Sequence, residues 1–223
     1  LMTFTYVGAT GGMVIISADD PGLHSSQNEQ DNRNLAKFAR AALLEPADSQ
    51  EAYDMVLEAF EISEKFEVPV IIRLTTRTSH SSSLVELGDF NPKPHPQIPY
   101  VKNIKKTIPV PMFARGHRLA AQERTAAMSA ASCESALNRI VHGRKDLGIV
   151  TSAVAYQYVK EIFPEFSILK LGWTNPLPKK LIADFASSVE KFLVVEELDP
   201  FLEDQIRAMG IKVVEHKTEL NML

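Results

Sequence analysis

The chain has 223 residues, a formal net charge of -4 and an apolar fraction of 45%. This apolar fraction is typical of a packed globular protein and excludes a disordered or fibrous chain. The negative charge argues against a nucleic-acid partner, which needs a basic surface. No apolar run approaches the roughly 20 residues that span a bilayer. We therefore expect neither nucleic acid nor a membrane among the partners.

The single cysteine, Cys133, limits the redox chemistry that the chain can carry. One thiol cannot form an intrachain disulfide, and it cannot hold an iron–sulfur cluster or a cysteine zinc site alone. The first residues lack the basic region of a secretory signal peptide. We therefore expect a cytoplasmic protein.

Residues 1–77 predict part of an α/β domain. Apolar runs predict strands at 13–18, 41–44 and 68–74. A helix falls between the last two, with Asp48 as its N-cap and Glu51 at the capping-box position. This order indicates a parallel sheet, but three strands are fewer than such a sheet usually has. We expect half of a domain, with an open sheet edge that recruits another strand.

A polar loop at residues 17–31 follows the first predicted strand. Ligands of α/β proteins bind beyond the carboxyl ends of parallel strands, so this loop is the first place to look for a site. The alternative is a solvated connection whose Asp and Ser residues only cap a helix at 32–38. A metal site at Asp19, Asp20 and His24 lacks a second cluster at ligand spacing, so we expect none.

Residues 78–145 predict a proline-rich linker followed by a helix. Six prolines fall between positions 92 and 111, where they disfavour regular structure. The run at 80–83, His-Ser-Ser-Ser, lacks a nucleophile-elbow pattern and predicts a flexible polar loop. A helix is expected from about Gly116 to Ala136.

Residues 146–223 predict a small doubly wound domain. Its strands are expected at 147–151, 167–171, 192–195 and 211–214, with helices between them. Ser152 and Asp199 are the expected N-caps of two of these helices. Pro200 in the first position and Gly210 just past the end fit the second of them.

Several strings of residues together resemble the alpha subunit of indolepyruvate ferredoxin oxidoreductase. They lie at 11–16, 18–22, 24–31, 44–46, 51–55 and 69–73, and again at 148–152, 156–160 and 195–203. The resemblance covers nearly the whole chain. It implies that residues 1–77 are the second half of a thiamine diphosphate pyrimidine-binding domain. Residues 146–223 would then be similar to the C-terminal domain of transketolase.

The resemblance also implies a chemistry. Enzymes of that family decarboxylate an arylpyruvate on thiamine diphosphate with Mg²⁺, oxidise it to an acyl-CoA and pass electrons through iron–sulfur clusters to ferredoxin. The implied partners are the rest of the alpha subunit, a beta subunit, ferredoxin, the 2-oxo acid and coenzyme A, in an oligomer. The residues that we expect to contact the cofactor are His24, Ser25, Ser26, Gln27, Asn28 and Glu29. Asp20 and Arg73 are the expected substrate contacts, Arg73 through a bidentate pair with a carboxylate.

The sequence departs from the family pattern in three places. It has no counterpart of the family's catalytic glutamate, of the Gly-Asp-Gly motif for magnesium and diphosphate, or of the cysteine-rich ferredoxin segment. No catalytic residue is therefore assigned. We expect the chain to be a central fragment that alone is inactive, binds no cofactor tightly and self-associates. The alternative is a non-catalytic α/β module that binds a partner through the open edge of its first sheet.

Overall fold

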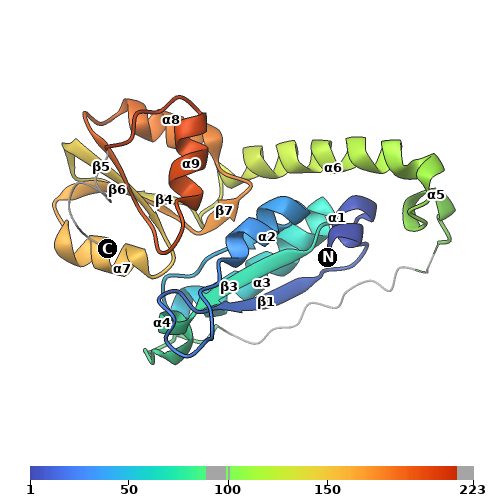
Figure 1. Ribbon diagram of the computed structural model, residues 1–223, viewed down its shortest axis with the longest axis horizontal. Helices are drawn as coiled ribbons and strands as arrows, with labels where there is room; N and C mark the ends of the chain where they lie inside the picture. The colour runs from blue at the N-terminus through green and yellow to red at the C-terminus, as the bar shows by residue number, and fades with distance from the viewer. Residues whose placement is uncertain (89–98, 100, 215–223) are drawn as a thin grey trace.

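The computed structural model describes residues 1–88, 99 and 101–214, which form two α/β units side by side (Figure 1). The elements of the first unit are α1 (Met2–Val7), β1 (Val14–Asp19), α2 (Asn32–Ala39), β2 (Ala42–Leu44), α3 (Ser49–Phe66), β3 (Val70–Thr75) and α4 (Thr76–His80). Two helices then lead away from the first unit and into the second: α5 (Ile104–Thr107) and α6 (Pro111–Ser132). The elements of the second unit are β4 (Arg139–Val141), β5 (Arg144–Ser152), α7 (Ala155–Ile162), β6 (Phe166–Leu171), β7 (Trp173–Asn175), α8 (Lys179–Ser187), β8 (Phe192–Val195) and α9 (Phe201–Ala208).

The first sheet has the strand order β1-β3-β2-β7. Strands β1, β3 and β2 run parallel, as the sequence predicts, and their carboxyl ends therefore share one edge. Strand β7, which follows the second unit's β6 in the chain, pairs antiparallel with β2 and supplies the fourth strand. Strand β1 lies at the other end of this order, and its Ile16 is 56% exposed.

Alternation along the strands explains how both faces of the first sheet are covered. Val70 and Ile72 face α3, where they join Met55 and Ala59 in one apolar cluster. Ile71 points to the opposite face and packs with residues that include Ala36 of α2. The helix α3 begins where the sequence predicts, because Asp48 Oδ1 accepts a hydrogen bond from Glu51 N at 2.9 Å.

The second sheet has the order β4-β6-β5-β8. Strands β5, β6 and β8 are parallel, whereas β4 is antiparallel to β6. Helices α8 and α9 cover one face through residues such as Phe185 and Ile206. Helix α7 covers the other face, and the first unit's Ala47 packs into the same cluster as Tyr156 and Val159.

Several sequence expectations need correction. Helix α6 begins at Pro111 rather than near Gly116, because proline is tolerated in the first turn. Ser152 lies inside β5, and the N-cap of α7 is Val154. Pro200, not Asp199, is the N-cap of α9.

The expected fourth strand of the second unit is also wrong. Residues 211–214 form no strand, although Val214 N donates to Phe192 O at 2.8 Å, and β4 supplies the fourth strand instead. Gly210 follows the end of α9 with φ +82°, as expected for a glycine there. Within the described part of the chain, no helix combines the length and apolar character that crossing a membrane requires.

Candidate functional site

Three charged residues lie buried where β1, β2 and β3 end. Asp19 ends β1, Glu45 follows β2, and Arg73 lies in β3. Arg73 Nε donates to Asp19 Oδ2 at 2.6 Å, and Arg73 Nη1 donates to Glu45 Oε1 at 2.6 Å. Burial alone would lower the pKa of Arg73, but the two carboxylates outweigh it and raise this pKa. Two nitrogens of the guanidinium are thus already bonded to carboxylates of this chain. A substrate role for Arg73 stays a prediction.

The carboxylate of Asp20 shapes the loop that follows β1. Its oxygens accept hydrogen bonds from the backbone amides of His24, Ser25 and Ser26 at 3.1, 2.7 and 2.7 Å. Thr76 Oγ1 donates to Asp20 Oδ1 at 2.6 Å. The Thr76 hydroxyl, followed by these amides, holds the pKa of Asp20 well below its usual range. Asp20 therefore anchors the loop to α4, and its expected contact with substrate stays a prediction.

The remaining loop candidates lie mostly at the surface. Gly22 has φ +82°, which suits glycine, and its N–H donates to Glu29 Oε1 at 2.8 Å. The side chains of His24, Gln27, Asn28 and Glu29 are exposed. The structure therefore brings together only part of the predicted set, and their role as cofactor contacts stays a prediction.

A small pocket of about 190 Å³ lies between this loop and α4. Ser25 and Ser26 line it, as do Asp19 and Asp20. The lining residues that sequence reasoning missed are Gln30, Thr76, Ser79 and His80. A signal was available, because Gln30 lies in the predicted loop itself, whereas Thr76, Ser79 and His80 follow β3, which is parallel to β1 and ends beside it. The site thus presents hydroxyl, amide and imidazole groups around a narrow polar space.

Arg33 connects the loop to the second unit. Its guanidinium is 1% exposed and forms a two-point pair with Asp31, at 2.8 Å from Nε and 2.6 Å from Nη2. Arg33 Nη1 donates to Glu196 Oε2 at 2.7 Å. Asp31 is also the N-cap of α2, accepting from Arg33 N at 3.1 Å, so the helix-capping alternative for the loop is partly correct. The end of the loop is therefore fixed against the segment between β8 and α9.

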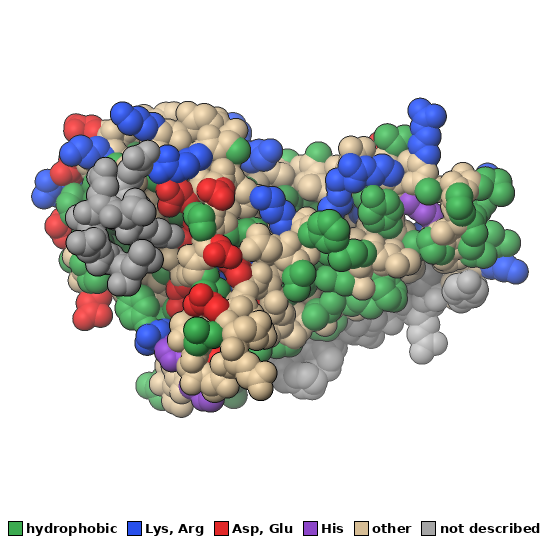
Figure 2. Space-filling view, in the orientation of Figure 1, with side chains coloured by type: hydrophobic (Ala, Val, Ile, Leu, Met, Phe, Trp, Pro, Cys, Tyr) green, Lys and Arg blue, Asp and Glu red, His purple; other side chains and the backbone are tan. Residues whose placement is uncertain are grey.

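Glu197 extends this set of charges at the boundary between the units. Burial raises the pKa of its carboxyl, and nearby Glu45 raises it further, against the influence of Arg73, Arg77 and Arg33. Figure 2 shows acidic side chains gathered along the same boundary. Polar atoms of four side chains lack a hydrogen-bond partner here among the described residues: Asp19 Oδ1, Glu45 Oε2, Arg73 Nη2 and Glu197 Oε2. This boundary therefore has three carboxylate oxygens and one guanidinium nitrogen without a hydrogen-bond partner among the described residues.

Comparison with protein families gives a match over residues 17–136, to the family described as pyruvate flavodoxin/ferredoxin oxidoreductase, thiamine diP-bdg, that is, thiamine diphosphate-binding. The matched range includes the loop, the ends of all three parallel strands and α4.

Curated relatives are similar over nearly all of this chain. The indolepyruvate oxidoreductase subunit IorA of Archaeoglobus fulgidus is 40% identical over 218 residues, which are 96% of this chain and 35% of the relative. The subunit of the same name from Pyrococcus abyssi is 38% identical over 98% of this chain and 36% of its own length. The chain thus spans about a third of the length of these relatives.

A solved structure shares the fold. The 2-oxoglutarate:ferredoxin oxidoreductase of Magnetococcus marinus superposes with a TM-score of 0.67 at 16% identity, over 96% of this chain and 47% of that one. At this identity the likeness concerns the arrangement of helices and strands alone.

Proposed function

Since this chain belongs to the pyruvate flavodoxin/ferredoxin oxidoreductase family that binds thiamine diphosphate, we propose that it is part of an enzyme that oxidises an arylpyruvate. The substrate is an indolepyruvate-like 2-oxo acid, the product is an acyl-CoA, and ferredoxin accepts the electrons. The observation that carries the proposal is the family match across residues 17–136, which include every residue that lines the small pocket. The names of the curated relatives support the indolepyruvate-like substrate.

The described residues suit one part of thiamine diphosphate better than the other. Hydroxyl groups of Ser25, Ser26, Thr76 and Ser79 surround the small pocket and are able to hydrogen-bond the polar atoms of a neutral heteroaromatic ring. The diphosphate and its magnesium find no such fit. No group of three metal-binding side chains occurs among the described residues, and no lysine or arginine lines the small pocket. We therefore place the diphosphate on other parts of the enzyme.

Thiamine diphosphate, when bound, supplies a thiazolium ring that stabilises the carbanion left by loss of carbon dioxide. The contribution of this chain is to shape the space beside that ring. Asp20 holds the amides of residues 24–26 and the Thr76 hydroxyl in one fixed arrangement. Because these donors already bond the Asp20 carboxylate, their role is to fix the shape of the loop rather than to bind charge on a substrate.

The proposal includes the partners that such a reaction needs: the rest of the alpha subunit, a beta subunit, iron–sulfur clusters, ferredoxin and coenzyme A. Its test is the complete enzyme that contains this sequence. We expect ferredoxin reduction that depends on indolepyruvate, coenzyme A and thiamine diphosphate, and that is slower with pyruvate or 2-oxoglutarate. If no arylpyruvate is oxidised, the proposed function is wrong.

The exposed edge of β1 favours a second candidate, a non-catalytic module that binds a partner strand. Unpaired strand edges recruit other strands, and β1 ends its sheet with Ile16 exposed. Calorimetry distinguishes the two candidates. Thiamine diphosphate with magnesium should bind the complete enzyme but not this chain alone, whereas a non-catalytic module predicts no binding in either case.

A further inference from the structure

A second pocket lies between the two units, next to the candidate site. It has a volume of about 490 Å³, within the roughly 300–1,000 Å³ typical of small-molecule pockets. We call it the inter-unit pocket. The lining residues that matter here are Asp48, Arg77, His80, Val154, Gln157 and Tyr158. His80 also lines the small pocket beside the loop, so the two spaces are neighbours.

The inter-unit pocket offers positive charge. Asp48 is its one acidic lining residue, and both of its oxygens already accept hydrogen bonds, from Glu51 N at 2.9 Å and from Gln157 Nε2 at 3.0 Å. Arg77 is exposed and forms no ion pair with any residue that the structure describes. Its guanidinium, together with the His80 imidazole, is therefore available to an anion, and a guanidinium matches the geometry of a carboxylate.

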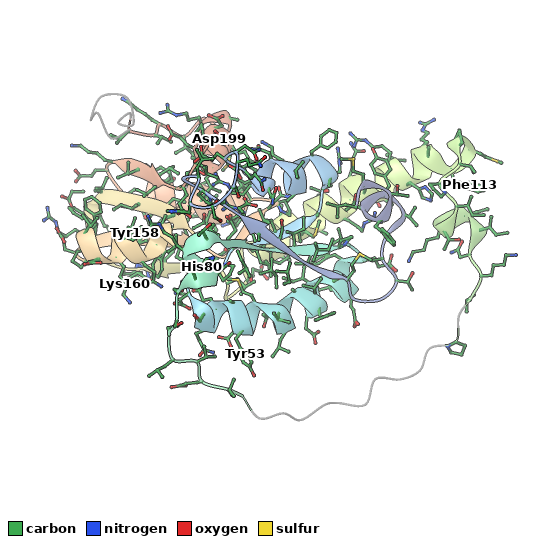
Figure 3. All side chains as sticks on the ribbon, turned by 60° about the horizontal axis from the view of Figure 1, so that its bottom comes forward. Tyr53, His80, Phe113, Tyr158, Lys160 and Asp199 are labelled. Carbon is green, nitrogen blue, oxygen red and sulfur yellow. The ribbon has the colours of Figure 1, made fainter. Side chains whose placement is uncertain are left out.

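The pocket also offers an aromatic wall. The Arg77 guanidinium carbon lies 5.8 Å from the centre of the Tyr158 ring, and Tyr158 is 41% exposed. Ala47 and Val154 add apolar surface to the same lining. Figure 3 places His80 at the junction of the units, with Tyr158 on the neighbouring α7. Cationic and aromatic groups thus meet across the boundary, one from each unit.

We propose that the inter-unit pocket binds a small carboxylate that carries an aromatic ring, through Arg77 and Tyr158. The carboxylate pairs with Arg77 beside His80, and the ring packs against Tyr158. If the ligand is the substrate of the enzyme, this inference rests on the proposed function. The ring of the arylpyruvate then occupies the inter-unit pocket, and its 2-oxo group faces the small pocket across His80. Tyr158 is then a residue that selects aromatic over aliphatic 2-oxo acids.

The test is a binding measurement that needs no turnover. Indole-3-acetate serves as the probe, because it has the ring and the carboxylate but no 2-oxo group. Acetate and indole each lack one of the two features. Calorimetry on the complete enzyme, without thiamine diphosphate, should show indole-3-acetate binding more tightly than either.

Substitutions separate the two contacts. Arg77→Gln should weaken indole-3-acetate binding by about tenfold or more, the usual effect of losing a charged hydrogen bond. Tyr158→Ala should weaken the probe but not acetate, while Tyr158→Phe keeps most of the affinity. Tyr158→Leu keeps apolar volume and replaces the alanine variant if that one fails to fold. Lys160→Gln is the matched control, because it removes one cation from the exposed face of the same helix.

Equal binding by wild type, Arg77→Gln and Tyr158→Ala would overturn the inference, as would acetate binding as tightly as indole-3-acetate. The proposed function fails separately. If the enzyme binds the probe through these residues but oxidises no arylpyruvate, this inference stands and the proposed function is wrong.

Discussion

The order of the loop after β1 depends on pH through the carboxylate of Asp20. The pKa of Asp20 is lowered, so its contribution to loop order is present above the ordinary aspartate pKa and is lost only when the pH falls through the lowered value. We expect the amides of residues 24–26 to stay protected from exchange down to acidic pH.

Asp20→Asn should accelerate exchange of those three amides at neutral pH, because an asparagine has only one acceptor oxygen to replace the two that bind them. Amide NMR measures this directly. Asp54→Asn, an exposed carboxylate on α3, is the control and should leave the loop unchanged. Unaltered exchange in Asp20→Asn would show that the carboxylate does not hold the loop.

The ionisation of Glu197 should affect stability in the opposite direction from that of Asp20. Its pKa is raised, so the folded state is favoured while the group is protonated, and that advantage is lost as the pH rises through the raised value. Glu197→Gln mimics the protonated form. We expect its Tm to exceed that of wild type at neutral pH and to converge with it in acid. A Tm difference that does not change with pH would argue against a raised pKa at Glu197.

The sequence predicts some of the residues at the site but not the contacts that they form. The loop was identified because polar residues follow a buried strand, and Ser25 and Ser26 do line the small pocket. Arg73 looked available for a substrate, yet it is buried between Asp19 and Glu45. That pairing joins residues 54 and 28 positions apart, which no local pattern reports.

At the scale of elements, α3 depends on its first turn. Asp48 caps the helix through Glu51 N and also accepts from Gln157 of the second unit. Asp48→Ala should lower the free energy of unfolding by about 0.5–2 kcal/mol, the usual cost of losing an N-cap. Urea denaturation measures this. Asp54→Ala lies on the exposed face of the same helix and should change stability by less than about 0.5 kcal/mol.

The sequence predicts those helices and strands whose signals lie within a short stretch of the chain. Helix α3 and the three parallel strands of the first unit follow from apolar periodicity and a capping residue. The sequence does not predict β7, because its pairing partner β2 lies about 130 positions earlier and no local pattern reports that pairing. Residues 211–214 carry the composition of a strand, but β4 takes the fourth place in that sheet. In both sheets, the fourth strand is determined by pairing between residues far apart in the sequence.

At the scale of the whole molecule, Arg33 joins the units. Arg33→Met removes the cation from beside Asp31 and Glu196 and should cost about 3–5 kcal/mol, because buried carboxylates then lose their counter-charge. Trp173, the chain's one tryptophan, lies in β7 and reports unfolding by fluorescence. Lys37→Met removes an exposed cation from the same helix and should cost less than about 1 kcal/mol. Equal losses in the two variants would mean that Arg33 does not join the units.

Strand β7 restricts how a ligand reaches the site. It is bonded to β2 along the main chain, and Asn175 Nδ2 also donates to Ala41 O at 2.6 Å. A swivel of one unit against the other would break these bonds and the Arg33–Glu196 pair, so these contacts oppose such a motion. Entry and exit then depend on residues 21–30, the stretch between the hydrogen bonds of Asp20 and the Asp31–Arg33–Glu196 contacts that fix the end of the loop.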